Sequence, residues 1–327
     1  MSTCDGDGAA TLDGESEAAL GPTTTRRRLL QASGLGLIGA TTLGLAGCSL
    51  GGDDEKGSAA ASGSTTGGSS NTSSGGSILD KWTREKKARL GVDLSFPPLQ
   101  FKDENGTPSG YIVEITNKMM KELGVEVEYV QTPFAQLFAG LSAGKFDMLG
   151  IAATILPSRA LRGWFADVPT FYESNVVLVK KGSGTTYDDL ENAKVTVLQG
   201  SSQAANAATL FPNASFRELA SANDAATEVA VERADATITS EFSVADAIKS
   251  NSDLEVLDAP PLFVDANAYL MPEGDTKLWL WVSNWMRYEA SHRTFEGLWR
   301  KWVVPDTQKY DLTTAVVGIN GEAVPVS

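Results

Sequence analysis

The sequence predicts an α/β protein of two lobes, each a sheet flanked by helices. Apolar segments of strand length alternate with longer segments whose apolar residues recur at helical spacing. This alternation runs through residues 89–159, restarts near residue 187 after a strong strand at 175–180, and continues to residue 249. Strands that alternate with helices are typical of a parallel sheet covered on both faces. Because the same order occurs twice, we expect two lobes with a cleft between them.

The N-terminal part of the chain lacks this alternation. Three arginines, residues 26–28, precede an apolar, glycine-rich run that ends at Cys48. We interpret residues 1–47 as a twin-arginine lipoprotein signal and Cys48 as the lipidated residue, because a charged region, an apolar region and small residues before a cleavage point are typical of export signals. The alternative is a membrane-spanning helix over residues 29–50, but its Gly and Thr residues make this run weakly apolar. Residues 48–77 are rich in Gly, Ser, Ala and Thr and predict a flexible tether.

The composition argues against several classes of function. The 327-residue chain has a formal net charge of −14, which disfavours a nucleic-acid partner. Both cysteines, Cys4 and Cys48, lie in the N-terminal part, so the folded part has no disulfide framework or cysteine zinc site. The single histidine, His292, removes most Ser–His–Asp and Cys–His schemes. We expect no metal, no cofactor, no catalytic residue and a monomeric protein.

The first α/β set leads to a segment that favours a carboxylate ligand. In chain order we expect a helix at 79–87, a strand at 89–93, a loop at 94–98, a short hairpin around the turn 103–106, a helix at 111–123, a strand at 125–130 and a helix at 133–143. The segment Gly144–Arg159 follows. Its strand, 146–151, ends in small residues that let a ligand approach the backbone, and Pro157 suits the first turn of a helix that carries Arg159. Free backbone N–H groups, the helix dipole and a planar guanidinium all favour a carboxylate.

The second set follows a loop at 165–172 and the strand at 175–180. We expect a short helix at 187–190, strands at 194–198, 216–219, 235–239, 255–258 and 266–271, and helices at 203–210, 222–232 and 244–249. The turn Gln199–Ser202 leads into the helix at 203–210. Two tryptophan-rich helices within residues 276–303 end the folded part, and we interpret their tryptophans as packing residues.

Taken in order, the motifs of residues 89–303 resemble the extracellular solute-binding proteins of family 3, the polar amino-acid class of ABC-transporter binding proteins. The similarity is carried by the segments Leu90–Pro98, Gly110–Ile115, Gly144–Arg159, Phe165–Ser174, Val197–Ser202 and Arg233–Ala236. The resemblance implies a type II periplasmic-binding-protein-like fold, in which two crossing strands join the lobes as a hinge. It places those crossings near Val177–Lys181 and Ala268–Pro272. It also implies these bounds: lobe 1 at 78–178, lobe 2 at 179–271, a return to lobe 1 through C-terminal helices at 272–310, and a tail at 311–327.

The same resemblance assigns ligand-binding roles. Arg159 is expected to pair with the ligand carboxylate, although a solvated helix residue is the alternative. Ala152 and Thr154 are expected to add hydrogen bonds, and Ser202 with Ser201 to donate from lobe 2. The aromatic ring of Phe96 is expected to lie against the body of the ligand, or else in the core.

Two positions depart from the pattern of this family. Ile151 stands where the family often has Ser, so one side-chain donor is missing. Ser240 stands where a late strand usually carries the Asp that holds the ligand ammonium. Glu241 or Asp93 is therefore expected to hold the ammonium, with Asp93 as a loop cap the alternative, or the ligand lacks a standard α-amino group.

These observations predict a lipid-anchored, extracytoplasmic receptor that binds an amino acid or similar carboxylate and delivers it to an ABC importer permease. One alternative is an enzyme similar to cyclohexadienyl dehydratase, which has this fold and a return strand similar to Ala268–Pro272. Its general acid would fall at Ser243, which is no acid, so Glu241 would have to replace it through a register shift. A ligand-sensing module is the other alternative.

Overall fold

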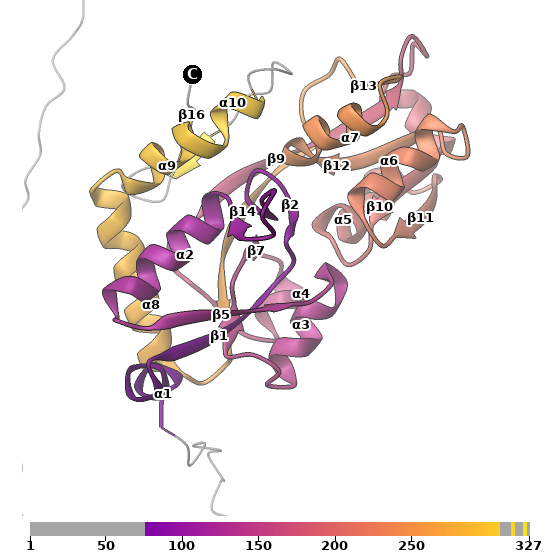
Figure 1. The fold of residues 1–327 in the computed structure, drawn as a ribbon. Helices are drawn as coiled ribbons and strands as arrows, with labels where there is room; N and C mark the ends of the chain where they lie inside the picture. Colours follow the sequence, from indigo (N-terminus) through magenta and orange to yellow (C-terminus); the bar gives the residue numbers. More distant parts are fainter. Residues whose placement is uncertain (1–75, 308–314, 318–322, 326–327) are drawn as a thin grey trace, which may run out of the picture. The chain divides into compact units, whose positions relative to one another are not determined.

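The computed structural model describes residues 76–307, 315–317 and 323–325 (Figure 1). The predicted signal at 1–47, the lipidation site Cys48 and the tether up to residue 75 lie outside the described residues. No helix in the described ranges is long and apolar enough to cross a bilayer.

The first lobe is built around a small parallel sheet. The strands β5 (Glu126–Gln131), β1 (Lys87–Val92) and β6 (Met148–Leu149) lie in the order β5-β1-β6, each parallel to its neighbour. Crossover helices make this parallel arrangement possible. The remaining elements of this lobe are α1 (Ile78–Glu85), β2 (Ser95–Phe96), β3 (Gln100–Lys102), β4 (Pro108–Ser109), α2 (Tyr111–Glu122), α3 (Phe134–Ser142), β7 (Ala152–Thr154), α4 (Pro157–Ala160) and β8 (Trp164–Phe165).

The second lobe is built on a larger, mixed sheet. The strand order of this sheet is β11-β10-β12-β9-β14-β7, with β13 paired to β9 and β8 paired to β14. The elements are β9 (Phe171–Lys180), the 3-10 helix η1 (Asp188–Asn192), β10 (Lys194–Leu198), α5 (Ser202–Leu210), β11 (Ser215–Leu219), α6 (Ala222–Ala230), β12 (Ala236–Ser240), the 3-10 helix η2 (Glu241–Ser243), α7 (Val244–Ser250), β13 (Leu254–Val256) and β14 (Phe263–Met271). Alternate residues of β9 join apolar clusters on the two faces, Val177 and Val179 on one and Val176 and Leu178 on the other.

Strands β9 and β14 connect the two lobes. They pair antiparallel over Phe171–Asn175 and Phe263–Asn267. Beyond this pairing β9 runs against β12 in the second lobe, whereas β14 runs against β7 and β8 in the first. The two connecting strands thus pair with each other at residues that precede the crossings expected near 177–181 and 268–272.

The chain returns to the first lobe through helices α8 (Thr276–Ser291), α9 (Thr294–Trp302) and α10 (Val304–Thr307), drawn in yellow in Figure 1. These helices complete an apolar cluster that extends from Leu79 to Val303. Trp285 and Trp299 are buried in it and the tryptophans at 279, 281 and 302 pack against it, as expected of packing residues. Two further strands, β15 (Ala315–Val317) and β16 (Ala323–Pro325), pair antiparallel within the predicted tail.

Asp147, just before β6, ties three elements of the first lobe together. Its carboxylate accepts hydrogen bonds from Lys81 Nζ at 2.7 Å, Trp82 Nε1 at 2.9 Å and the Arg89 amide at 3.1 Å. Burial opposes ionisation, but the hydrogen bonds from Lys81, Trp82 and Arg89 outweigh it and lower the pKa of Asp147. The ionised carboxylate therefore stabilises the fold.

We expect Asp147→Asn to lower the free energy of unfolding by about 1–3 kcal/mol at pH 7. Because the folded-state pKa is depressed, this stabilisation is present above the unfolded pKa, about 3.9, and is lost as the pH falls through the folded value. Urea unfolding at pH 7 and pH 3 measures the difference, which shrinks at pH 3. Glu128→Gln, which removes an exposed partner of Lys87, is the control and leaves stability nearly unchanged. Equal stability of Asp147→Asn and wild type at pH 7 would contradict this role.

Candidate functional site

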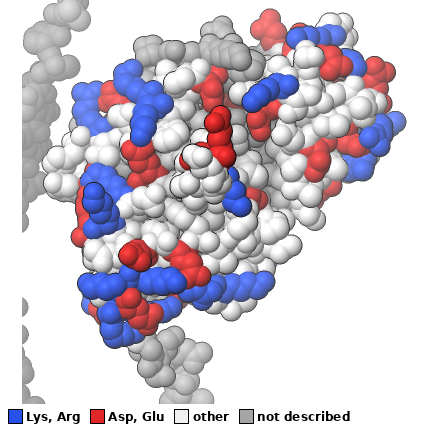
Figure 2. Space-filling model, viewed as in Figure 1, with Lys and Arg blue, Asp and Glu red and all other residues white. Residues whose placement is uncertain are grey.

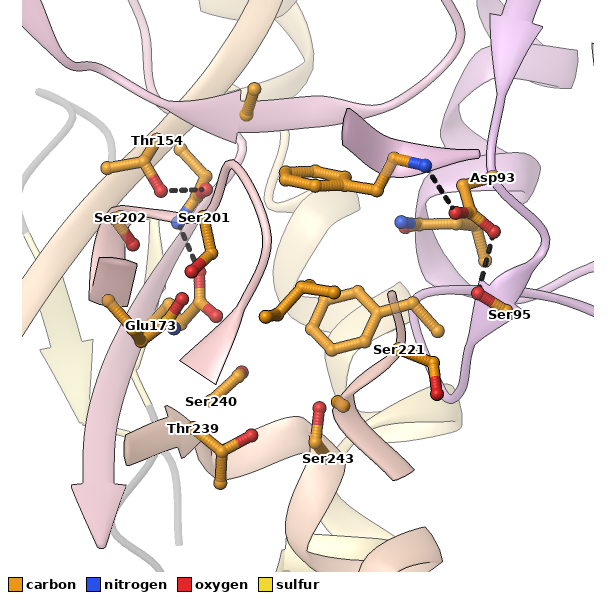
Figure 3. Close-up of a pocket in the computed structure, with 18 of the residues that line it drawn as sticks. Asp93, Ser95, Thr154, Glu173, Ser201, Ser202, Ser221, Thr239, Ser240 and Ser243 are labelled. Carbon is orange, nitrogen blue, oxygen red and sulfur yellow. Dashed lines mark hydrogen bonds between the residues drawn. The ribbon is translucent and has the colours of Figure 1, made fainter. Parts of the chain in front are cut away.

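A cavity of about 320 Å³ lies between the two lobes and is lined by residues of both (Figure 3). Cavities of this size accommodate small molecules. Eight of the nine residues predicted to bind ligand line it: Asp93, Phe96, Ala152, Thr154, Arg159, Ser201, Ser202 and Ser240. Figure 3 shows Thr154, Ser201 and Ser202 together on one side, with Asp93 on the opposite side. The ninth, Glu241, does not line the cavity.

Arg159 is held at the cavity wall by contacts with both lobes. It lies in the short helix α4 directly after β7 and is only 5% exposed, so it is not a solvated helix residue. Its Nη1 donates to the carbonyl oxygen of Thr154 at 3.0 Å and its Nη2 to that of Gly200, in the second lobe, at 3.0 Å. The guanidinium also lies 4.5 Å from the centre of the Phe138 ring. Burial lowers the pKa of Arg159 to about 10, with Glu173 and Asp265 opposing the shift, so the group remains cationic at neutral pH.

Ser201 and Ser202 form the N-terminus of α5 on the second lobe. Ser201 is the N-cap, and its hydroxyl accepts from the Ala204 amide at 3.1 Å. Serine is favoured there because its oxygen satisfies a backbone N–H that has no partner within the helix. The positive end of α5 consequently faces the same cavity as Arg159, and both features favour a negatively charged group.

Phe96 borders both the cavity and the apolar core. Its ring lines the cavity and also packs edge-to-face on Phe242, with 6.2 Å between ring centres. Phe134 and Phe171 also line the cavity, so part of its wall is aromatic. Such a wall suits the apolar body of a ligand between its polar ends.

The two acids predicted to hold an ammonium occupy different environments. Glu241 is buried in η2, where its Oε1 accepts from the Ser174 amide at 2.8 Å, and burial raises its pKa to about 8. Asp93 lines the cavity, but its oxygens accept from Ser95 Oγ at 2.6 Å and from the Phe134 amide at 2.7 Å. Asp93 is therefore also tied to its own loop through Ser95, the loop cap being the alternative that the sequence left open, and to the first residue of α3.

The floor of the cavity is polar, and sequence reasoning missed it. Glu173 on β9 and Asn267 on β14 line the cavity. Asn267 Nδ2 donates to Glu173 Oε2 at 3.1 Å, and Thr154 Oγ1 bonds to Asn267 Oδ1 at 3.2 Å. Behind them Asn175 Nδ2 donates to Asp265 Oδ2 at 3.2 Å, and Gln203 Nε2 donates to Asn175 Oδ1. A strict two-residue alternation from Phe171 onward would have placed Glu173 and Asn175 on one face.

The residues that line the cavity include more acidic than basic side chains. Among the described residues that line the cavity, Arg159 is the one basic side chain, whereas Asp93, Glu173 and Asp246 are acidic. Ser243 lines the cavity as well and has no acidic proton to give a substrate. On the outer face shown in Figure 2, acidic and basic side chains are intermingled. The arrangement suits a small ligand with a carboxylate for Arg159 and a cationic group.

A comparison with protein families matches residues 88–305 to the bacterial extracellular solute-binding proteins, family 3. Among curated proteins, the chain is 27% identical over 223 residues to the arginine-binding extracellular protein ArtP of Bacillus subtilis, covering 67% of this chain and 86% of ArtP. It spans 47% and 61% of the length of two probable amino-acid ABC transporter-binding proteins, from Haemophilus influenzae and Sinorhizobium fredii.

Solved structures show the same architecture. The ancestral amino acid-binding protein AncCDT-1, described as a precursor of cyclohexadienyl dehydratase, is 31% identical with a TM-score of 0.62, covering 69% of this chain and 99% of that one. A putative ABC-transporter binding component from Wolinella succinogenes, complexed with lysine, is 28% identical with a TM-score of 0.61 and the same coverage. The two-lobed, type II α/β fold predicted from the sequence is confirmed.

Proposed function

We propose that this chain, which belongs to family 3 of the bacterial extracellular solute-binding proteins, binds an amino acid between its lobes and delivers it to an ABC importer. The observation that carries this proposal is the buried cation Arg159, held at the wall of a small cavity beside the N-terminus of α5. A ligand carboxylate there gains a two-pronged, charge-assisted contact. The names of relatives that bind arginine or lysine support an amino acid as the ligand class.

The roles of the other lining residues belong to the same proposal. Thr154 and the Ala152 backbone add hydrogen bonds, Ser201 and Ser202 contribute from the second lobe, and Phe96 packs on the ligand body. The three acidic lining residues favour a ligand that carries at least one positive charge in addition to its carboxylate.

We further propose that the receptor works as a monomer outside the cytoplasm and is anchored through Cys48 after removal of residues 1–47. The tether at 48–77 then separates the anchor from lobe 1 (78–178 and 272–310) and lobe 2 (179–271), and the tail at 311–327 follows. Metabolic labelling with a radioactive fatty acid tests the anchor: wild type incorporates the label, and Cys48→Ser does not.

A dehydratase is the second candidate, because AncCDT-1 is described as the precursor of such an enzyme. Ser243 argues against it, since a hydroxyl does not supply the acidic proton that the elimination needs. Glu241, the acid nearest to it in sequence, does not line the cavity. Incubation with prephenate is therefore expected to yield no phenylpyruvate, and its formation would favour the enzyme.

We expect calorimetric titration with the twenty L-amino acids and L-cystine to give at least one dissociation constant in the micromolar range, about −8 kcal/mol. The protein is first unfolded and refolded to remove ligand retained from the cell, and the released small molecules are identified by mass spectrometry. Basic amino acids are expected to bind more tightly than acidic ones, because Arg159 is outnumbered by three acids in the cavity. Absence of binding to every member of the panel would refute the proposed function.

A further inference from the structure

One face of the paired strands β9 and β14 carries two carboxylates opposite each other. Glu173 and Asp265 are direct cross-strand partners in the antiparallel register, and both side chains are buried. Like charges in this position destabilise a sheet. Glu173 lines the cavity and Asp265 does not. The fold thus keeps a buried acid at the floor of the ligand cavity with a second acid beside it.

Neutral groups hold Glu173 in place without cancelling its charge. Asn267 donates to its Oε2 at 3.1 Å, and the Ser240 hydroxyl hydrogen-bonds to it as well. The Ser240 oxygen accepts from the Phe242 amide at 3.2 Å, which leaves the hydroxyl proton for Glu173. In the described part of the chain no lysine or arginine forms an ion pair with Glu173. Arg159 directs its hydrogen bonds to the carbonyl oxygens of Thr154 and Gly200 instead.

We propose that Glu173 binds the cationic group of the ligand and is the residue that selects ligands with an ammonium next to their carboxylate. This inference rests on the proposed function and names the residue that binds the positive charge of the ligand. Arg159 and Glu173 line one cavity from α4 and from β9, so a zwitterion can contact both. Ser240, which stands where the family usually carries an ammonium-binding Asp, then donates its hydroxyl to the carboxylate of Glu173.

The electrostatics of the cavity agree with this role. The pKa of Glu173 is raised to about 7, mainly by burial and also by Asp265, against the lowering effect of the Ser240 and Asn267 hydrogen bonds and of Arg159. The charged groups that face it are Arg159 on α4, Asp265 on β14 and Glu241 on η2. An ammonium favours the ionised form of Glu173. Affinity for amino acids is therefore expected to rise from pH 6 to pH 8, and binding near pH 7 to release protons.

Glu173→Gln tests the proposal, because it removes the charge and keeps the shape. We expect every amino acid that binds wild type to bind this variant at least about 100-fold more weakly at pH 8. For each bound amino acid, the matching acid without the α-amino group is expected to lose no affinity on this substitution. Glu289→Gln is the matched control: Glu289 is equally a buried glutamate, paired with Lys118 at 2.9 Å outside the cavity, and its substitution leaves affinity within about threefold.

Stability distinguishes this role from a structural one. At pH 8 Glu173→Gln is expected to melt at the same temperature as ligand-free wild type or higher, because a buried, ionised carboxylate has been removed. A variant that binds as tightly as wild type, or that loses binding only together with its fold, would overturn the inference and leave the proposed function standing. If wild type binds no amino acid, the proposed function fails and this inference with it.

Discussion

Arg159→Ala is expected to weaken amino-acid binding by about 100- to 4,000-fold, which corresponds to a loss of roughly 3–5 kcal/mol. The guanidinium is buried, cationic and within the cavity wall, so its removal leaves the ligand carboxylate without its charged partner in a site shielded from water. A micromolar ligand would then bind in the millimolar range. Arg159→Lys is expected to recover part of the loss, because lysine restores the charge but not the planar fork. Calorimetry with the amino acids that bind wild type measures both effects.

Arg162→Ala is the matched control for this experiment. Arg162 lies two residues after the end of α4, is exposed, and its amide donates to the Arg159 carbonyl at 2.9 Å. Removing its side chain alters the local charge by the same amount without opening the cavity. Unchanged affinity in Arg159→Ala, with the melting temperature of a folded protein, would show that the carboxylate binds elsewhere.

Trp299→Ala is expected to lower the free energy of unfolding by about 3–5 kcal/mol. Trp299 in α9 is fully buried, and its ring centre lies 5.0 Å from that of Tyr111, 5.6 Å from that of Phe242 and 6.3 Å from that of Phe171. Truncation leaves a cavity among aromatic rings that belong to both lobes and to the connecting strand. Urea denaturation monitored by circular dichroism measures the loss.

The same substitution is expected to weaken ligand binding moderately. Phe171 lines the cavity, and Phe242 packs against Phe96, which lines it too. Leu280→Ala on the neighbouring helix α8 is the control, because that side chain is 47% exposed and its loss has little effect. A stability of Trp299→Ala close to that of the control would contradict the packing of α9 described above.

Much of the first lobe could be predicted because its elements follow simple periodicity. The apolar positions expected on the helix at 111–123, among them Ile112, Ile115 and Met119, form the buried face of α2. Arg159 could be placed at the cavity for a similar reason, since a proline at a helix start and small residues at a strand end have few structural interpretations.

Glu173 and Asp265 were missed because the two strands extend beyond the segments that the sequence predicts. The strand expected at 175–180 begins at Phe171, and the one expected at 266–271 begins at Phe263. Glu173 and Asp265 lie in these additional strand residues, on a buried face where alternation leads one to expect apolar side chains. Hydrogen bonds from Asn267 and Asn175 make this burial tolerable, and such partners become visible only when the two strands are paired.

The order in which the lobes are completed has a consequence for the protein as it leaves the ribosome. The second lobe is formed by one continuous stretch of chain between β9 and β14, so its sheet can close as soon as that stretch has been made. The main apolar cluster of the first lobe instead joins Leu79 to Val303, and it stays open until α8 and α9 emerge. We therefore expect the nascent chain to carry a finished second lobe beside an unfinished first one until α8 and α9 emerge.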